Sequence, residues 1–358
     1  MRRVTTLATA LVAGALALTA CGGSSTSTTK ATDSASPGAS SSSSASSSPA
    51  VALKVGLAYD IGGRGDQSFN DAAAAGLDKA KSELGIDAKE LEATGGEADT
   101  AKEDRLRLLA TSGYNPVIAI GFAYEGAVKK VAAEMPDTHF AIIDDDAATG
   151  DNIANLVFAE EQGSYLVGAA AALKSKSGNI GFVGGVDVPL IHKFEAGYAA
   201  GAKAVKADIK VQVKYLTQPP DFSGFGDPAK GKTAAAGMYD AGADVVYQAA
   251  GGSGGGVFEA AKAAGKLAIG VDSDQYKTAD KAVQSVILTS MLKRVDVAVY
   301  DFIKSASEDK FTAGVVRYDL AKDGVGYSTS GGQLDDIVTK LDDYKAKIIS
   351  GAIVVPTK

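Results

Sequence analysis

Short apolar runs alternate with amphipathic or alanine-rich stretches from about residue 51 to the end of the chain, and this alternation strongly constrains the fold. The apolar runs have the length of strands and cover residues 53–59, 88–93, 116–120, 139–143, 153–158, 178–184, 211–216, 244–248, 267–271, 284–289 and 313–319. The stretches between them have the length of helices and cover residues 69–84, 99–112, 122–134, 161–174, 190–207, 229–241, 254–264, 291–306 and 332–350. Strand, helix and strand repeated in this way predict an α/β fold, with parallel sheets and helices on both faces.

The repeating pattern divides near residues 155–160, and a second series of strands and helices begins at Gly178. We therefore predict two doubly wound lobes joined by three crossings, near residues 155–160, 284–290 and 315–330. The first lobe would contain residues 51–157 and 290–316, and the second would contain residues 158–289 and 317–358. Two such lobes place the carboxyl ends of both sheets around one cleft, and hinged closure over a ligand is the expected motion.

The first fifty residues have the composition of a targeting segment followed by a tether. A basic start (Arg2, Arg3) precedes an apolar stretch from Leu7 to Leu18, which is too short to remain as a membrane-spanning helix. Leu18-Thr-Ala-Cys21 resembles the cleavage box of bacterial lipoproteins, so residues 1–20 are predicted to be a signal peptide and Cys21 the lipidated residue. The alternative is a plain signal peptide in which Cys21 has no role. Residues 21–50, rich in serine, are predicted to be a flexible tether because they carry too little apolar area to fold.

Charge and residue counts exclude several classes of function. The formal net charge is −7, and removal of Arg2 and Arg3 with the signal makes it −9, which argues against binding to nucleic acid or to anionic membranes through the folded region. Attachment to a membrane would then depend on lipid alone. The chain has one cysteine and two histidines, in no spacing typical of zinc or haem sites, and no triad is indicated. We expect no cofactor, no bound metal and no catalytic residue.

Polar and aromatic residues gather where the predicted strands end. The run from Val55 to Tyr59 stops at Asp60, a glycine-rich turn follows, and a helix is predicted to open at Phe69. Similar residues follow the other strands: Phe122; Asp144, Asp145 and Asp146; Gly184 and Gly185; residues 221–227 with Phe222 and Phe225; Gly251 and Gly252; and residues 272–274. Each of these alone is as readily a helix cap or a core residue. The presence of such residues after most of the predicted strands favours a binding site for a ligand with a flat apolar face and several hydroxyl groups.

Two glycine-rich segments look like phosphate-binding motifs. Residues 226–233 fit the Walker A pattern and stand between a strand and a helix. Pro228 removes an amide that a phosphate cradle needs, and Asp227 puts an anion beside it, so we reject this interpretation. Residues 251–256 do not fit the dinucleotide-binding pattern, because Val257 stands where the third glycine is required. The Arg64-Gly-Asp66 tripeptide belongs to the longer turn, and the three aspartates at 144–146 do not match a calcium loop.

The longest of these patterns, Asp60-Ile-Gly-Gly-Arg-Gly-Asp-Gln-Ser-Phe-Asn70, resembles the signature of the basic membrane protein (BMP), or PnrA-like, lipoproteins. Further similar segments are Gly181-Phe-Val-Gly-Gly185, Pro189-Leu-Ile191, Phe194-Glu-Ala-Gly-Tyr198, Asp227-Pro-Ala-Lys-Gly-Lys232, Gly242-Ala-Asp-Val-Val246, Ala250-Gly-Gly-Ser-Gly254, Gly270-Val-Asp-Ser-Asp-Gln275 and Thr289-Ser-Met-Leu-Lys-Arg-Val295. Together they cover residues 55 to about 320. The resemblance implies a type I periplasmic-binding-protein fold and a purine nucleoside held between the lobes.

The resemblance also implies roles for individual residues. Asp60, Asn70 and Asp144 would contact the base, and Phe69 would stack on it. A second ring would come from the other lobe, where Phe225 fits slightly better than Phe194. Gly252, Asp272 and Lys293 would contact the ribose. The further candidates are Phe122, Asp146 and Asp274, and the run at 144–146 departs from the family pattern, so the aspartate that meets the base stays open.

These observations predict a lipid-anchored, monomeric receptor that binds purine nucleosides and delivers them to an ABC permease. A receptor of the same fold for a sugar or an autoinducer is an alternative, although such receptors typically stack tryptophan on the sugar and this chain has none. A nucleoside hydrolase and a surface sensor or adhesin without a transport role are two more.

Overall fold

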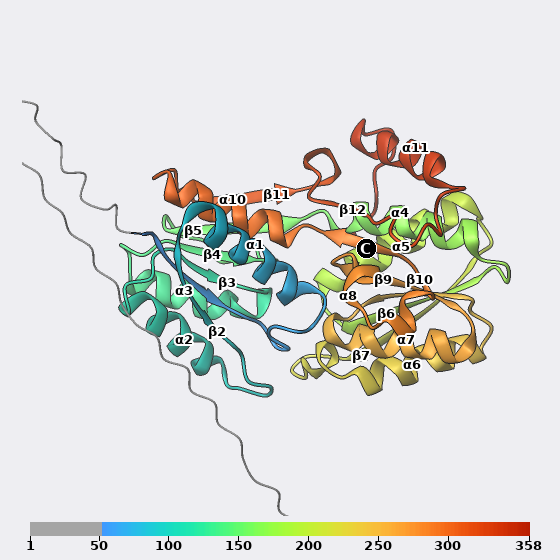
Figure 1. The fold of residues 1–358 in the computed structure, drawn as a ribbon, viewed down its shortest axis with the longest axis horizontal. Coiled ribbons are helices and arrows are strands. Elements are labelled where there is room, and N and C mark those ends of the chain that lie inside the picture. The colour runs from blue at the N-terminus through green and yellow to red at the C-terminus, as the bar shows by residue number, and fades with distance from the viewer. Residues whose placement is uncertain (1–51) are drawn as a thin grey trace, which may run out of the picture. The chain divides into compact units, whose positions relative to one another are not determined.

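Two six-stranded sheets organise the part of the chain that the computed structural model describes, residues 52–358 (Figure 1). The predicted signal peptide, the lipidated Cys21 and the tether lie outside the described residues. In Figure 1 the first sheet lies on the left, the second on the right, and the segments from α10 to α11 run along the top.

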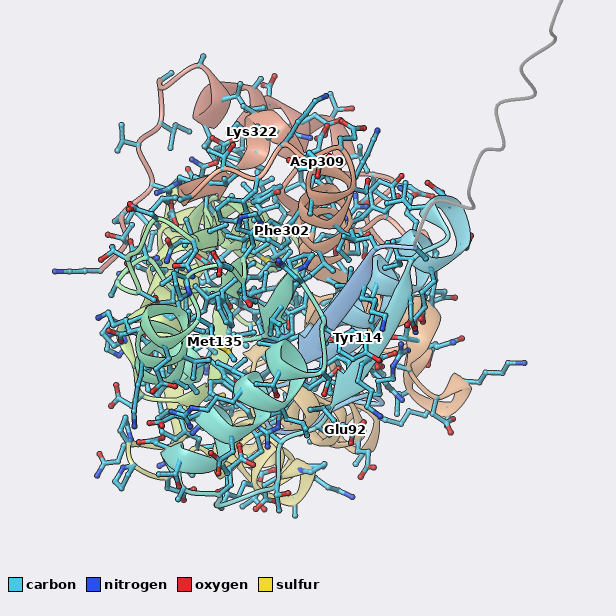
Figure 2. The ribbon with its side chains drawn as sticks, turned by 90° about the vertical axis from the view of Figure 1, so that its left-hand side faces the viewer. Glu92, Tyr114, Met135, Phe302, Asp309 and Lys322 are labelled. Atoms are coloured by element: carbon cyan, nitrogen blue, oxygen red, sulfur yellow. The ribbon has the colours of Figure 1, made fainter. Side chains whose placement is uncertain are left out.

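The first sheet is parallel throughout and has the strand order β2-β1-β3-β4-β5-β11. Its strands are β1 (Lys54–Ala58), β2 (Asp87–Leu91), β3 (Val117–Ala119), β4 (Phe140–Ile143), β5 (Ile153–Phe158) and β11 (Gly314–Tyr318). Its helices are α1 (Phe69–Leu84), α2 (Asp99–Thr111), η1 (Phe122–Tyr124), α3 (Glu125–Glu134) and α10 (Val295–Ser307). These elements are the first lobe. Figure 2 faces this lobe, with Phe302 of α10 above Tyr114 and Met135 in the view.

The second sheet repeats this arrangement, with the order β7-β6-β8-β9-β10-β12 and an antiparallel last strand. Its strands are β6 (Asn179–Val186), β7 (Lys210–Thr217), β8 (Val245–Ala249), β9 (Leu267–Asp272), β10 (Ile287–Lys293) and β12 (Val325–Tyr327). Its helices are α4 (Glu160–Lys174), α5 (Pro189–Val205), η2 (Ser223–Phe225), α6 (Pro228–Asp240), η3 (Gly251–Ser253), α7 (Gly254–Ala264), α8 (Gln275–Thr278), α9 (Lys281–Gln284), η4 (Leu320–Lys322) and α11 (Val338–Ile349). These elements are the second lobe.

Successive side chains of a strand point to opposite faces of its sheet, so each sheet has an apolar core on both faces. In β1, Leu57 joins the core under α1 and α10, whereas Ala58 joins the core under α2 and α3. In β6, Phe182 faces α4 and α5, and Val183 faces α6 and α7. Because both faces are covered, the central strands are apolar almost throughout, as parallel sheets require.

Helix α4 is buried on nearly all sides and packs closely against α5. Its residues from Gly163 to Ala172 are all buried, so it is apolar around its circumference rather than on one stripe. A side chain at Gly201 of α5 would collide with the backbone carbonyl of Tyr165 in α4. The glycines and alanines of these helices therefore set the distance between their axes.

The α/β class and the two doubly wound lobes predicted from the sequence are confirmed. The chain leaves the first sheet after β5, returns after β10 and leaves again after β11. Residues 290–293 were predicted to lie in the first lobe, and residues 291–293 at the start of a helix, but they instead continue β10 of the second sheet. They do so because Leu292 pairs with Asp272 of β9 and Lys293 with Val325 of β12. The last helix begins at Val338, and β12 with the short helices α8 and α9 had not been expected.

Candidate functional site

A cavity lies between the carboxyl ends of the two sheets. Both sheets reverse their strand order there, between β1 and β3 in the first lobe and between β6 and β8 in the second. Ligands of open α/β sheets bind at such points. The candidate residues that line the cavity are Asp60, Phe69, Asn70, Phe122, Asp144, Phe194, Phe225, Asp272 and Lys293. The site therefore draws on both lobes.

Three candidates lie outside the cavity lining. Gly252 is one position beyond Gly251, which does line it. Asp146 is exposed in the loop after β4. Asp274 precedes α8, where its Oδ2 accepts a hydrogen bond from the hydroxyl of Ser330 (2.5 Å) and pairs with the ammonium group of Lys277 (2.9 Å). Of the three neighbouring aspartates, the structure thus turns only Asp144 toward the cavity, whereas Asp145 accepts hydrogen bonds from the amides of its own loop.

Lys293, the last residue of β10, is the charged centre of the cavity. Its side chain is 2% exposed, and Nζ lies 2.5 Å from Oδ2 of Asp144 and 3.3 Å from Oε1 of Glu160. Burial alone would lower the pKa of Lys293, but the nearby carboxylates of Asp144, Glu160 and Asp272 outweigh it and raise the pKa. The ammonium group also faces the rings of Phe69, Phe158 and Phe194 at 5.1–5.4 Å from their centres. Lys293 therefore remains charged.

Carboxylates outnumber this single cation in the cavity lining. Burial raises the pKa of Asp60 and of Asp144 to about 6, and that of Asp272 to about 7. Oδ1 of Asp144 is buried and has no hydrogen-bond partner among residues 52–358. Buried polar atoms are nearly always bonded, so this oxygen marks a position where a ligand donor would be accommodated. Asp144 and Asp272 both have positive φ, 68° and 62°, directly after β4 and at the end of β9, so the two lobes present their carboxylates in the same way.

The turn between β1 and α1 is held by its own side chains. The carboxylate of Asp66 accepts the backbone amides of Ser68, Asn70 and Asp71 at 2.8–3.1 Å. The side-chain oxygen of Asn70 accepts the amide of Asp60 (3.1 Å), and its amide group donates to Asp66 (3.0 Å) and to the carbonyl of Ile61 (3.3 Å). Asn70 therefore holds the backbone of Asp60 within the turn, and its side-chain amide donates hydrogen bonds to other atoms of the same turn.

The phenyl rings come from both lobes. Phe69 opens α1, and Phe225 ends η2 in the second lobe; both are partly exposed and line the cavity. Phe194 of α5 is only 3% exposed and faces Lys293, so Phe225 is the more available second ring. Phe122 and Phe222 meet edge to face across the two lobes, with ring centres 6.0 Å apart. The aromatic arrangement suits a flat ligand held between Phe69 and Phe225.

Sequence reasoning missed several lining residues and two residues behind the lining. Asp66 lines the cavity although we assigned it only to the turn, and Leu190 and Ile191 supply an apolar wall from the start of α5. The sequence held a signal for all three residues, because each falls within a segment that resembles the BMP family. Glu160 and Ser68 act behind the lining, and only tertiary contacts reveal them.

The segment that fits the Walker A pattern is the start of a helix. Asp227 caps α6 by accepting the amide of Lys230 (3.0 Å), and Lys232 pairs with Glu259 (2.9 Å). Neither lysine lines the cavity. Among residues 52–358 no helix is long and apolar enough to cross a membrane, and no group of acidic, histidine or cysteine side chains is arranged to hold a metal.

The fold and this cavity define a two-lobed solute-binding protein. The chain belongs to the PnrA-like family of ABC transporter substrate-binding proteins, whose model matches residues 52–358, so the resemblance seen in the sequence is confirmed. The CD4+ T-cell-stimulating antigen of Listeria monocytogenes is 37% identical over 322 residues, which cover 85% of this chain and 88% of that protein. The ABC transporter nucleoside-binding protein BmpA of Lactococcus lactis is 37% identical over 324 residues, covering 86% and 90%. An ABC transporter solute-binding protein from Aeropyrum pernix has a similar structure, with a TM-score of 0.74, 31% identity and coverage of 86% and 94%.

Proposed function

We propose that this protein captures a purine nucleoside between its lobes and delivers it to an ABC permease. The observation that carries the proposal is the joint placement of Phe69 and Phe225, from opposite lobes, beside the buried polar group of Asp144, Lys293 and Asp272. Rings on two sides fit a planar base, and a carboxylate beside an ammonium group fits the two neighbouring hydroxyls of a ribose. The name of the Lactococcus lactis relative supports the same ligand class.

In this proposal the first lobe binds the base. Asp60 and the unpaired oxygen of Asp144 accept its N–H groups, while Asn70 keeps Asp60 in place. Asp272 and Lys293 bind the ribose, and the backbone around Gly251 and Gly252 allows it to approach closely. Binding energy is then gained fully only when the lobes close, because each lobe supplies one ring and part of the polar group.

We further propose that the protein acts as a monomer on the outer side of the cytoplasmic membrane, held there by lipid on Cys21. The lipoprotein box that ends at Cys21 and the serine-rich segment after it support this location. Replacement of Cys21 by serine should move the protein from the membrane fraction to the medium or the soluble fraction. Retention in the membrane fraction would refute the lipid anchor while leaving the ligand proposal untouched.

A thermal-shift screen tests the ligand class. Inosine, adenosine and guanosine should raise the melting temperature of the protein, whereas hypoxanthine and ribose alone should raise it less, because each lacks half of the contacts. Stabilisation by pentoses or hexoses alone would instead favour the sugar-receptor alternative. Release of free base from inosine during the incubation would indicate a hydrolase.

A further inference from the structure

We propose that Ser68 is a positioning residue that holds the carboxylate of Asp272 across the lobe boundary and, with Gln67, locks the closed lobes together. This inference rests on the proposed function in one respect, that Asp272 binds the ligand. It assigns a role to residues that do not line the cavity and that no ligand contact would explain.

Three hydrogen bonds join the end of the β1–α1 turn to the second lobe. The hydroxyl of Ser68 donates to Oδ2 of Asp272 (2.5 Å), and the hydroxyl of Ser273 donates to the carbonyl of Ser68 (3.0 Å). The side-chain amide of Gln275 donates to the carbonyl of Gln67 (2.9 Å). Ser68 is fully buried and Gln275 is 2% exposed, so separation of the lobes would expose both groups and break all three bonds. We call these three bonds the interlobe latch.

Ser68 stands where a helix-capping serine would be expected, but its hydroxyl does not cap α1. It precedes Phe69, the first residue of the helix, and makes no side-chain capping bond. Asp66 accepts the free amides of the first turn instead. A serine at this position ordinarily accepts a hydrogen bond from its own helix. Here the hydroxyl is available to act as a donor toward the other lobe.

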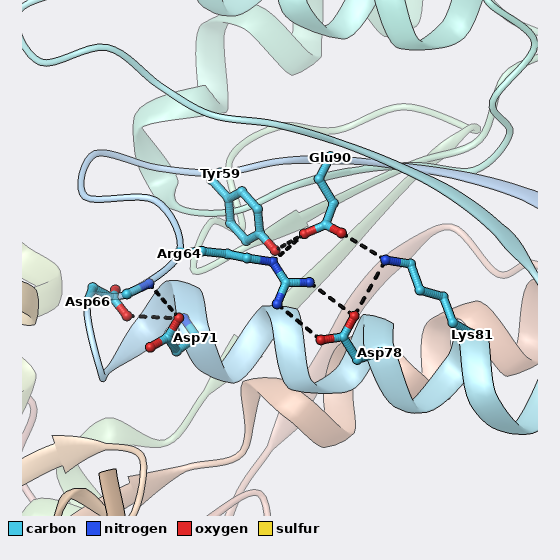
Figure 3. A network of polar contacts seen from close by, with 8 residues as sticks. Tyr59, Arg64, Asp66, Asp71, Asp78, Lys81 and Glu90 are labelled. Atoms are coloured by element: carbon cyan, nitrogen blue, oxygen red, sulfur yellow. Dashed lines mark hydrogen bonds and ion pairs between the residues drawn. The ribbon is translucent and has the colours of Figure 1, made fainter. Parts of the chain in front are cut away.

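The first-lobe side of the interlobe latch is held by several contacts within its own lobe. Arg64 pairs with both carboxylate oxygens of Asp78 (3.0 Å each) and with Glu90 (2.6 Å), which ties the turn to α1 and β2 (Figure 3). Asp71 accepts the amides of Gly65 (2.7 Å) and Gln67 (2.9 Å) from the other side of the turn. Gln67 has a φ of 54°, in the left-handed region, and this fixed conformation directs its carbonyl toward the second lobe.

The second-lobe side is equally fixed. The side-chain oxygen of Gln275 accepts the amide of Val271 (2.9 Å) and the side-chain amide of Gln248 (2.8 Å). The backbone amide of Gln275 donates to Ser290 (3.1 Å). These bonds within the second lobe hold the side-chain amide of Gln275 where it donates to the carbonyl of Gln67. Because the groups on both sides are held within their own lobes, we expect docking of the lobes to cost little side-chain entropy.

The carboxylate of Asp272 takes part both in the proposed ligand contact and in the contact between the lobes. Ser68 engages Oδ2 of Asp272, whereas Oδ1 has no hydrogen-bond partner among the described residues and belongs to a side chain that lines the cavity. A ribose hydroxyl bound at Oδ1 would find a carboxylate that Ser68 already orients. Loss of the Ser68 hydroxyl should therefore weaken both the ligand contact and the closed state.

The test compares Ser68→Ala and Ser273→Ala with the parent protein, and uses inosine as the probe. Ser328→Ala is the matched control, since Ser328 is also a buried serine, 4% exposed, but bonds only within the second lobe. We expect inosine to dissociate about tenfold faster from Ser68→Ala, as for loss of one hydrogen bond to a charged group, and severalfold faster from Ser273→Ala. The radius of gyration of ligand-free Ser68→Ala, from small-angle X-ray scattering, should exceed that of the parent. Ser328→Ala should match the parent in both measurements.

A pH profile separates positioning of Asp272 from a general loss of packing. The charged or titratable groups that face Asp272 are Lys293 of β10, Asp66 of the turn, Asp144 after β4 and Tyr247 of β8, and all remain in the variant. The hydroxyl of Ser68 lowers the pKa of Asp272, so its removal should move the acidic loss of affinity to higher pH. A packing defect would weaken binding without moving that midpoint.

The outcomes distinguish this inference from the proposed function. If the parent protein binds no nucleoside, the proposed function fails, and the scattering comparison of the ligand-free proteins still tests the interlobe latch. If the parent binds inosine but both variants release it at the parent rate, with the same radius of gyration, the interlobe latch is refuted and the proposed function stands. If Ser68→Ala does not fold, the same comparison with Ser273→Ala decides.

Discussion

At the scale of single residues, the cavity combines two partly exposed phenyl rings, those of Phe69 and Phe225, with buried charged groups. Phe69 is partly exposed although it begins a helix and carries a large apolar ring. A ligand that covered this ring would remove apolar area from water, which supports the proposed stacking role of Phe69. Lys293 and Asp144 are both nearly inaccessible to solvent and stabilise each other at 2.5 Å.

Replacement of Phe69 by alanine should weaken nucleoside binding by about tenfold or more, because a stacked base contributes about 1–3 kcal/mol. Isothermal titration calorimetry with inosine measures the change. Phe311→Ala is the matched control, since Phe311 stacks on His139 (ring centres 3.9 Å apart) outside the cavity lining. Equal affinities for parent and Phe69→Ala would remove Phe69 from the site.

The affinity for inosine should fall as the pH is lowered from about 8 to about 5.5. Burial raises the pKa of Asp272 to about 7 and that of Asp144 to about 6, so both carboxylates take up protons in this range. A protonated carboxyl group accepts hydrogen bonds from ligand hydroxyls less strongly than a carboxylate does. Titrations at a series of pH values test this prediction, and an affinity that is constant over the range would contradict it.

The stability of the ligand-free protein should respond to pH in the opposite sense. The pKa values of Asp60, Asp144 and Asp272 lie above the value of about 3.9 for an unfolded chain, so the folded state binds protons more tightly. Their contribution to the free energy of unfolding is full below about pH 4 and is lost as the pH rises through 6 and 7. Urea unfolding at pH 5.5 and at pH 8 measures this change, and these groups should contribute more to the free energy of unfolding at pH 5.5. An equal free energy of unfolding at the two pH values would contradict the prediction.

At the scale of elements, the strands and long helices could be predicted from the sequence because their apolar periodicity is local. Helix α1 and helix α7 have the predicted bounds. The end of β10 could not be predicted, since residues 290–293 are held extended by pairing with strands distant in the sequence. The carboxylates at strand ends were identifiable for the same local reason, whereas the link from Ser68 to Asp272 spans 204 residues and leaves no local pattern.

The contact between α4 and α5 gives a prediction about stability. Gly201→Val should lower the free energy of unfolding by about 2 kcal/mol or more, because the added side chain would collide with the carbonyl of Tyr165 and force the helices apart. Gly237→Ala is a suitable control, since Gly237 is an exposed glycine inside α6 with nothing near its Cβ position. The control should gain about 0.5–1 kcal/mol from its better helix propensity. Equal unfolding midpoints for the parent and Gly201→Val would contradict the assigned packing.

At the scale of the whole molecule, the same strand order occurs twice and brings two strand-reversal points to one cavity. The three crossings between the sheets lie near Glu160, Lys293 and Asp319. Lys293 thus lines the cavity and also stands at a crossing, beside Glu160 at another. We expect ligand contact and lobe closure to be coupled through this pair as well as through the interlobe latch.

Calorimetric titration of the parent protein with inosine, alongside hypoxanthine and ribose, is the decisive test of nucleoside binding. We expect saturable binding of one inosine per chain, clearly weaker binding of the base and of the sugar alone, and a loss of affinity of about tenfold or more in Asp272→Ala. An absence of binding heat with inosine, together with saturation of the protein by a sugar, would contradict the proposed function.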